Sequence, residues 1–171
     1  MTTPRLLIMG PDGCGKDTLA RLIRDMTGLR YPEPTSLTWA RHVMDWNDGR
    51  DIEEWWSKRR DHREEWIDAA LRMQYPDPTR LIDIAFQVAD IYTGLRNEDE
   101  LCAALQAYSF RGVLWCWNQA LTHTHGMSMS IEVATFLTQV HNVPWFICPP
   151  NSTSVRRMCR YLNLPFIRST L

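Results

Sequence analysis

Apolar residues fall along the chain in two patterns, short continuous runs and repeats at helical spacing. The run Leu6-Leu7-Ile8-Met9 has the length of a buried strand and predicts one over residues 5–9. After residue 16, apolar positions recur on one face of a helix that Gly28 ends, namely Leu19, Leu22, Ile23 and Met26. The pattern therefore predicts a strand, a loop and a helix at the start of the chain.

Predicted strands and helices continue to alternate towards the carboxyl end of the chain. Further strands are predicted over 91–93, 113–117 and 145–148. Helices are predicted from a cap at Thr35 or Ser36 to the breaker Asn47-Asp48-Gly49, over 52–73, from Pro78 onwards, and over 97–107, 130–140 and 154–162. Strands that alternate with helices imply a parallel sheet with right-handed crossovers, and ligands bind at the carboxyl ends of its strands.

Length and composition narrow the class of protein. At 171 residues, 44% of them hydrophobic, the chain fits one α/β domain over residues 1–171. A net charge of −1 disfavours a dedicated binder of duplex DNA or of an anionic membrane. The N-terminus lacks a signal segment, no apolar run approaches membrane-spanning length, and the five cysteines show no paired metal spacing. We expect a soluble cytoplasmic protein with reduced thiols.

The residues between the first strand and the first helix carry the strongest motif. The segment Gly10-Pro11-Asp12-Gly13-Cys14-Gly15-Lys16-Asp17-Thr18 has the G-x-x-x-x-G-K spacing of a phosphate-binding loop, with the required strand before it and helix after it. Its glycines allow a tight turn with inward N–H groups, the helix directs its positive dipole end at the anion, and Lys16 reaches the β- and γ-phosphates. The predicted ATP phosphate-binding residues are Gly10, Asp12, Gly13, Cys14, Gly15, Lys16, Asp17 and Thr18.

One position departs from the usual motif, in which a Ser or Thr that binds Mg²⁺ follows the lysine. This chain has Asp17 there and Thr18 one place later. A carboxylate beside Lys16 at a helix N-terminus suits a hard cation, directly or through water, so Asp17 and Thr18 are the predicted metal ligands. Cys14 leads to a second hypothesis, that ATP binding is sensitive to oxidation, because a helix N-terminus favours a thiolate.

The charged segment over 58–66 supplies further candidates. If it is helical, Arg63 and either Arg59 or Arg60 lie near one face. Two such guanidinium groups suit a kinase, which holds an acceptor phosphate and neutralises charge on the transferred group. The alternative is a solvated face in which the arginines pair with Glu64 and Glu65.

Arg96 follows the predicted strand 91–93 at its carboxyl end, where ligands bind in an open parallel sheet. We predict it as the second site residue after Lys16. Asp90, at the other end of that strand, is expected to be structural. Glu100 either orients the Arg96 guanidinium or forms an Arg–Glu pair that merely caps the next helix.

Three of these features together resemble the bacteriophage deoxynucleoside monophosphate kinases, of the P-loop nucleoside monophosphate kinase group. They are the Lys16-Asp17-Thr18 sequence, the segment Thr93-Gly94-Leu95-Arg96-Asn97-Glu98-Asp99-Glu100, and the helix with Arg60, Arg63 and Trp66. The last third of the chain matches weakly. Gly94 departs from the family, whose members can carry an aspartate there, and Asn118 stands where a basic residue is expected.

The resemblance implies a P-loop NTPase-like three-layer α/β fold with a parallel sheet, in which residues 35–88 form a helical acceptor-binding insertion. It implies phosphate roles for Lys16, Arg63 and Arg96. The Asp12-Gly13 pair also resembles the loop of thymidylate kinases, where this aspartate approaches the deoxyribose 3′-hydroxyl. Trp39 and Trp66 are candidates near the base, although most of the eight tryptophans are expected in the core.

The sequence thus predicts an ATP- and Mg²⁺-dependent kinase that converts a dNMP to a dNDP. The predicted catalytic residues are Lys16, Arg63 and Arg96, and the predicted acceptor-binding residues are Asp12, Trp39, Arg60, Arg63, Trp66 and Arg96. Two alternatives stay open, a P-loop kinase for a modified base in DNA or a small metabolite, and a non-catalytic nucleotide-binding module.

The expected partners are ATP and the dNMP substrate. Membrane binding and stable nucleic-acid binding are not expected. If the chain is viral, we expect the protein in the host cytoplasm. The oligomeric state is left open, and a homodimer is one alternative. His123 and His125, beside His141, are interpreted as a polar loop rather than a metal site.

Overall fold

The structure is a computed structural model that describes residues 4–43, 51–75, 77–118 and 129–167. Over these residues the centre is a parallel sheet in the order β2-β1-β3-β4. The strands are β1 (Arg5–Met9), β2 (Ile91–Tyr92), β3 (Phe110–Cys116) and β4 (Trp145–Cys148). In register, Leu7 lies opposite Tyr92 on β2 and opposite Val113 on β3. The central strand β1 therefore carries its loop to the middle of the sheet's carboxyl edge.

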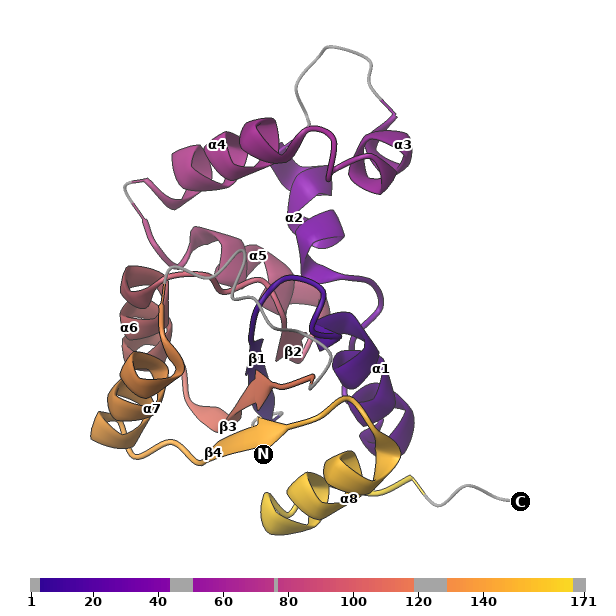
Figure 1. The fold of residues 1–171 in the computed structure, drawn as a ribbon, viewed down its shortest axis with the longest axis vertical. Coiled ribbons are helices and arrows are strands. Elements are labelled where there is room, and N and C mark those ends of the chain that lie inside the picture. The colour runs from indigo at the N-terminus through magenta and orange to yellow at the C-terminus, as the bar shows by residue number, and fades with distance from the viewer. Residues whose placement is uncertain (1–3, 44–50, 76, 119–128, 168–171) are drawn as a thin grey trace.

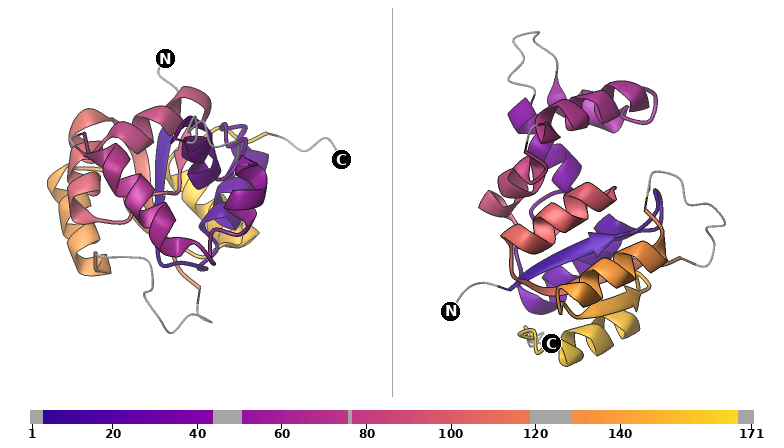
Figure 2. Two further views of the ribbon diagram at one scale, coloured as in Figure 1. Left: turned by 90° about the horizontal axis from the view of Figure 1, so that it is seen from above. Right: turned by 90° about the vertical axis from the view of Figure 1, so that its left-hand side faces the viewer.

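Helices cover both faces of the sheet (Figures 1 and 2). On one face, Leu6 and Ile8 pack under α1 (Lys16–Thr27) and α8 (Ser152–Tyr161). On the other, Leu7 and Met9 pack under α5 (Arg80–Val88), α6 (Glu98–Ala107) and α7 (Ile131–Val140). Because successive strand residues point to opposite faces, the continuous apolar run of β1 is buried on both sides. The predicted three-layer α/β fold is confirmed.

A helical unit stands beyond the sheet, at the top of Figure 1, made of α2 (Thr35–Val43), α3 (Ile52–Ser57) and α4 (Arg63–Gln74). Its core is aromatic. The Trp66 ring stacks on that of Trp55, with centroids 4.3 Å apart, and meets Trp39 edge-on at 5.0 Å. Leu81 and Ile84 of α5 complete this core, while the opposite face of α5 packs on the sheet. Helix α5 thus joins the helical unit to the sheet.

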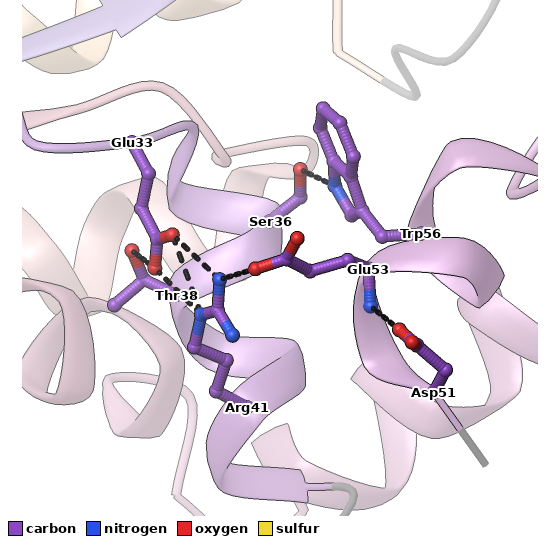
Figure 3. Close-up of polar contacts among 7 residues, drawn as sticks. All are labelled: Glu33, Ser36, Thr38, Arg41, Asp51, Glu53 and Trp56. Carbon is purple, nitrogen blue, oxygen red and sulfur yellow. Dashed lines mark hydrogen bonds and ion pairs between the residues drawn. The ribbon is translucent and has the colours of Figure 1, made fainter.

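Polar contacts fix α3 against α2 (Figure 3). Arg41 of α2 donates to Glu53 of α3 at 2.9 Å and to Glu33, before α2, at 3.3 Å. The Trp56 indole donates to the Ser36 hydroxyl at 3.1 Å. These exposed and half-exposed bonds lie around the aromatic core and set the position of α3 relative to α2.

The prediction of one helix over 52–73 is wrong. Helix α3 ends at Ser57 and α4 begins at Arg63, with a turn between them in which the Asp61 N–H bonds to the Lys58 carbonyl at 2.9 Å. No glycine or proline marks this break. Tertiary packing explains it, because a continuous helix would separate Trp55 and Trp66 by about 16 Å, at 1.5 Å per residue, and their rings could not stack.

The other predicted elements are present with shifted ends. Strand β3 begins at Phe110 rather than at 113, α5 begins two residues after Pro78, and α8 begins at Ser152 rather than at 154. The predicted breaker at 47–49 and the two histidines His123 and His125 lie outside the described residues.

Candidate functional site

The loop that joins β1 to α1 turns through glycines with positive φ. Gly13 and Gly15 have φ of 77° and 97°, in the left-handed region that favours glycine. At Gly10 space is also lacking, because a Cβ would lie 2.7 Å from the Cys116 carbonyl oxygen and 2.9 Å from the Cys14 sulfur. The loop over residues 10–16 is therefore pressed against the carboxyl end of β3.

Lys16 is the first residue of α1, and its side chain folds back over the loop. It is 8% exposed, and its Nζ donates to the carbonyl oxygens of Gly10 and Pro11, at 2.8 Å each. Burial, followed by the charge of Arg96, lowers the pKa of Lys16. An ammonium group has three donors, so one N–H remains for an anion at the loop. Gly15, just before α1, provides no side-chain cap for the first-turn N–H groups.

The Asp12 carboxylate forms ion pairs with two arginines from distant parts of the chain. Arg63, at the start of α4, lies 2.6 Å from one carboxylate oxygen, and Arg96, after β2, lies 2.6 Å from the other. Burial by itself would raise the pKa of Asp12, but the charge of Arg96 and the hydrogen bond and charge of Arg63 lower it below its ordinary value. The carboxylate is therefore ionised at neutral pH, between two guanidinium groups.

Asp17 directly follows Lys16 in the sequence and has a different environment from Asp12. Its Oδ1 accepts hydrogen bonds from the Tyr31 hydroxyl at 2.6 Å and from the Thr93 hydroxyl at 3.2 Å. The Thr93 and Thr35 hydroxyl oxygens are 2.8 Å apart. Burial, together with Asp17, raises the pKa of Tyr31 far above its ordinary value, so the phenol stays neutral. Neutral hydroxyl groups thus fix this carboxylate.

Glu100 supports the backbone that carries Arg96. The carboxylate is 2% exposed, and its two oxygens accept from the Arg96 N–H at 3.1 Å and from the Tyr92 hydroxyl at 2.8 Å. Burial raises the pKa of Glu100 to about 7, although the Tyr92 hydrogen bond lowers it. The contact seen is with the Arg96 backbone, so Glu100 holds the turn after β2. Gly94 fits this turn, because a Cβ there would lie 2.7 Å from the Tyr92 hydroxyl.

Asp90 lies at the opposite end of β2, away from this site. It forms an ion pair with Arg30 at 2.7 Å, and its N–H bonds to the Arg30 carbonyl at 2.8 Å. These contacts agree with the structural role expected for Asp90.

The structure brings Asp12, Lys16, Arg63 and Arg96 together, but not every predicted residue. Arg60 is exposed in the turn before α4 and is not among the side chains that bind Asp12. Trp39 and Trp66 are buried in the aromatic core of the helical unit. Thr18 is exposed on α1. Direct contact of Trp39, Arg60 and Trp66 with an acceptor stays a prediction.

Four residues near the site were not among the predicted site residues, namely Tyr31, Thr35, Arg59 and Thr93. The Arg59 guanidinium lies over the Trp56 ring at 3.9 Å and is half-buried. Burial lowers the pKa of Arg59, while the charges of Asp17 and Asp12 raise it, so this arginine lies within electrostatic reach of the loop. Thr93 is the last residue of the predicted strand 91–93, and this position at the carboxyl end of a strand is a signal for a site residue. Tyr31 has no comparable signal in the sequence.

None of the described helices is long and apolar enough to cross a membrane. Within the described ranges, no group of three or more His, Cys, Asp or Glu side chains is arranged to hold a metal ion. A cation at Asp17 and Thr18 would therefore need phosphate oxygens or water to complete its coordination.

Comparisons with protein-family profiles and with curated proteins give no match. Among solved structures, the chain is similar to a sugar kinase from Janibacter sp. HTCC2649 in an unliganded crystal structure. The sequence identity is 16% and the TM-score 0.44, over 95% of this chain and 96% of that chain. A likeness this weak carries no argument about activity. The resemblance to the phage kinases rests on its motifs and stays a prediction.

Proposed function

We propose that this protein is an ATP- and Mg²⁺-dependent kinase that phosphorylates a deoxynucleoside monophosphate. The observation that carries the proposal is the convergence of Arg63 and Arg96 on Asp12, beside the loop that holds Lys16. Transfer between two phosphates requires positive groups that position both and neutralise the developing charge. Lys16 would bind the β- and γ-phosphates of ATP, and the two arginines would exchange Asp12 for the acceptor phosphate.

The electrostatics of Asp12 favour an anionic acceptor over a neutral alcohol. A neutral hydroxyl acceptor needs a general base, whose pKa should lie near the working pH. The pKa of Asp12 is lowered and two guanidinium groups occupy its oxygens, so it is a poor base. The phosphate of a monophosphate is already anionic and needs no base. In the bound state Asp12 would be free to contact the acceptor sugar.

Asp17 and Thr18 fit the Mg²⁺ that this reaction uses, since carboxylate and hydroxyl oxygens are hard ligands. Among the described residues, the hydrogen bonds to Asp17 end on Oδ1, so Oδ2 is the oxygen available to a cation. Bound Mg²⁺ would neutralise charge on the β- and γ-phosphate oxygens. Tyr31 and Thr93 would hold the carboxylate in position.

The test is ADP release with ATP and Mg²⁺ across the four common dNMPs, dUMP and modified dNMPs. We expect stimulation by at least one monophosphate, its loss in Lys16→Ala, and its retention in Lys58→Ala, which removes an exposed lysine elsewhere. Calorimetry measures ATP binding separately. Binding without stimulation would favour a kinase for modified DNA bases or small metabolites, or a non-catalytic module. Absence of ATP binding would overturn the assignment of the loop.

A further inference from the structure

Two cysteines meet behind the 10–16 loop. The Cys116 thiol, at the end of β3, donates to the Cys14 carbonyl oxygen at 3.2 Å. Both side chains touch Gly10, where an added Cβ would lie 2.9 Å from the Cys14 sulfur and 3.5 Å from the Cys116 Cβ. The two side chains therefore lie against the same glycine, and a disulfide would require their Cβ atoms to come to about 3.8 Å apart.

We propose that Cys14 and Cys116 form a reversible disulfide that distorts the 10–16 loop, with hydrogen peroxide as the oxidant. The Cys14 thiolate attacks a peroxide oxygen, so that the O–O bond breaks and a sulfenic acid and hydroxide form. The Cys116 sulfur then attacks the Cys14 sulfur, the S–O bond breaks, and the hydroxyl leaves as water with the Cys116 proton. Two electrons pass from the thiols to peroxide, and a dithiol reductant reverses the change. Since both sulfurs are buried, a small oxidant is required.

The surroundings assign different roles to the two sulfurs. The neighbouring Cys116 thiol lowers the pKa of Cys14 to about 7, against burial and together with the charge of Lys16. The neighbouring Cys14 thiol in turn raises the pKa of Cys116, which therefore stays protonated. Burial raises the pKa of Cys148 and of Cys159 to about 12 and about 11. Cys14 is thus the nucleophile and Cys116 the resolving thiol.

The disulfide would act on the loop because of the position of Cys14. An S–S bond of about 2.05 Å would tie Cys14 of the loop to Cys116 of β3 beside Gly10, which both side chains already contact closely. Cys14 is two residues before Lys16 and lies between the glycines that turn the chain. Since loss of one hydrogen bond from the loop to a charged phosphate costs about tenfold or more in affinity, we expect ATP affinity to fall at least about tenfold.

The first experiment treats the whole protein with hydrogen peroxide and maps disulfides by mass spectrometry without reduction. We expect a link between the Cys14 and Cys116 peptides that dithiothreitol removes. Cys102→Ser, a half-buried cysteine on α6, should keep the link. Cys116→Ser should lose it and accumulate a Cys14 sulfenic acid that dimedone traps. No link, or a link between Cys116 and its register neighbour Cys148, would overturn the proposal.

If Cys116→Ser fails to fold, Cys148→Ser provides the second test, because it removes the competing neighbour and should still form the Cys14–Cys116 link. The effect on the loop rests on the proposed function and is measured separately, as ATP affinity before oxidation, after oxidation and after reduction. Unchanged affinity in the linked protein would overturn the distortion of the loop. Absence of ATP binding in the reduced protein would instead count against the proposed function, while peptide mapping still decides the disulfide.

Discussion

The two carboxylates beside Lys16 are held by opposite chemistry. On the arginine side, formed by Asp12, Arg63 and Arg96, the partners of the carboxylate are two cations. On the hydroxyl side, formed by Asp17, Tyr31 and Thr93, the partners are neutral. Both sides draw on residues from separate segments that meet at the carboxyl edge of the sheet.

This difference indicates which ligand each side suits. A phosphate can take the place of a carboxylate between guanidinium groups, because it offers similar oxygen geometry and negative charge. Neutral hydroxyls orient a carboxylate without cancelling its charge, which leaves it suited to a cation. Under the proposed function, the arginine side would bind the acceptor phosphate and the hydroxyl side the metal ion.

The largest expected effect comes from removing a cation of the arginine side. Arg96→Ala should lower kcat/KM for the dNMP by about 100-fold or more, as for other groups that stabilise charge in phosphoryl transfer. Arg63→Ala should act in the same direction. Initial rates over a dNMP titration measure the effect, and Arg156→Ala on α8, an exposed arginine, is the matched control. Unchanged dNMP kinetics in both variants would remove the acceptor role of this side.

The arginine side was largely predictable, because its members carry local signals. Asp12 lies within a spaced glycine motif, and Arg96 follows a strand at the edge where ligands bind. The pattern that points to Arg63 is that of a continuous helix over 52–73, which the structure breaks between Ser57 and Arg63. Arg63 reaches Asp12 because α4 starts at that residue, and the packing of Trp55 on Trp66 that explains the break has no signature in the sequence.

The hydroxyl side was less predictable, because it consists of common residue types that meet only in the folded chain. The loop motif predicts Asp17, but the contacts of Tyr31 and Thr93 depend on the positions of the segment before α2 and the end of β2. The sheet and its covering helices followed from apolar patterning, which reports burial directly. Polar contacts between distant segments have no such periodicity.

The second prediction concerns Glu100, which holds the backbone of Arg96. We expect its contribution to the unfolding free energy to depend on pH. Burial raises the pKa of Glu100 from its ordinary 4.5 to about 7, so the folded protein binds this proton more tightly than the unfolded chain. The resulting stabilisation is complete below pH 4.5 and is lost as pH rises towards 7. Relative to Glu100→Gln, the wild type should lose about 1.4 kcal/mol of unfolding free energy per pH unit in that window.

Urea denaturation of both proteins at several pH values between 4.5 and 8 measures this difference. Glu98→Gln, an exposed glutamate in the first turn of α6, is the control and should follow the wild type. A difference between wild type and Glu100→Gln that does not change with pH would show that the buried carboxyl titrates equally in both states.

A smaller effect should separate the metal role of the hydroxyl side from the acceptor role of the arginine side. Asp17→Asn removes the negative charge and keeps the shape of the side chain. We expect the Mg²⁺ concentration for half-maximal activity to rise about tenfold, as for loss of one carboxylate ligand, while KM for the dNMP stays unchanged. Asp25→Asn, an exposed aspartate of α1, is the control. An increase in the dNMP KM without a change in Mg²⁺ dependence would contradict the assignment.

The smallest expected effect comes from removing one of the hydroxyl groups that bind Asp17 on the hydroxyl side. Tyr31→Phe removes the 2.6 Å hydrogen bond to Asp17 but leaves the Thr93 contact with Asp17 in place. The variant also loses the 3.1 Å contact between the Tyr31 and Thr93 hydroxyls. Loss of a hydrogen bond to a charged group should lower the unfolding free energy by about 1.5 kcal/mol, which urea denaturation measures. Because the lost donor is neutral, this difference should be the same at low and high salt. The Arg63 contact with Asp12 is partly exposed and joins two charges, so the destabilisation caused by Arg63→Ala should shrink as salt rises. Equal salt dependence of the two variants would mean that the two sides do not differ in their electrostatics.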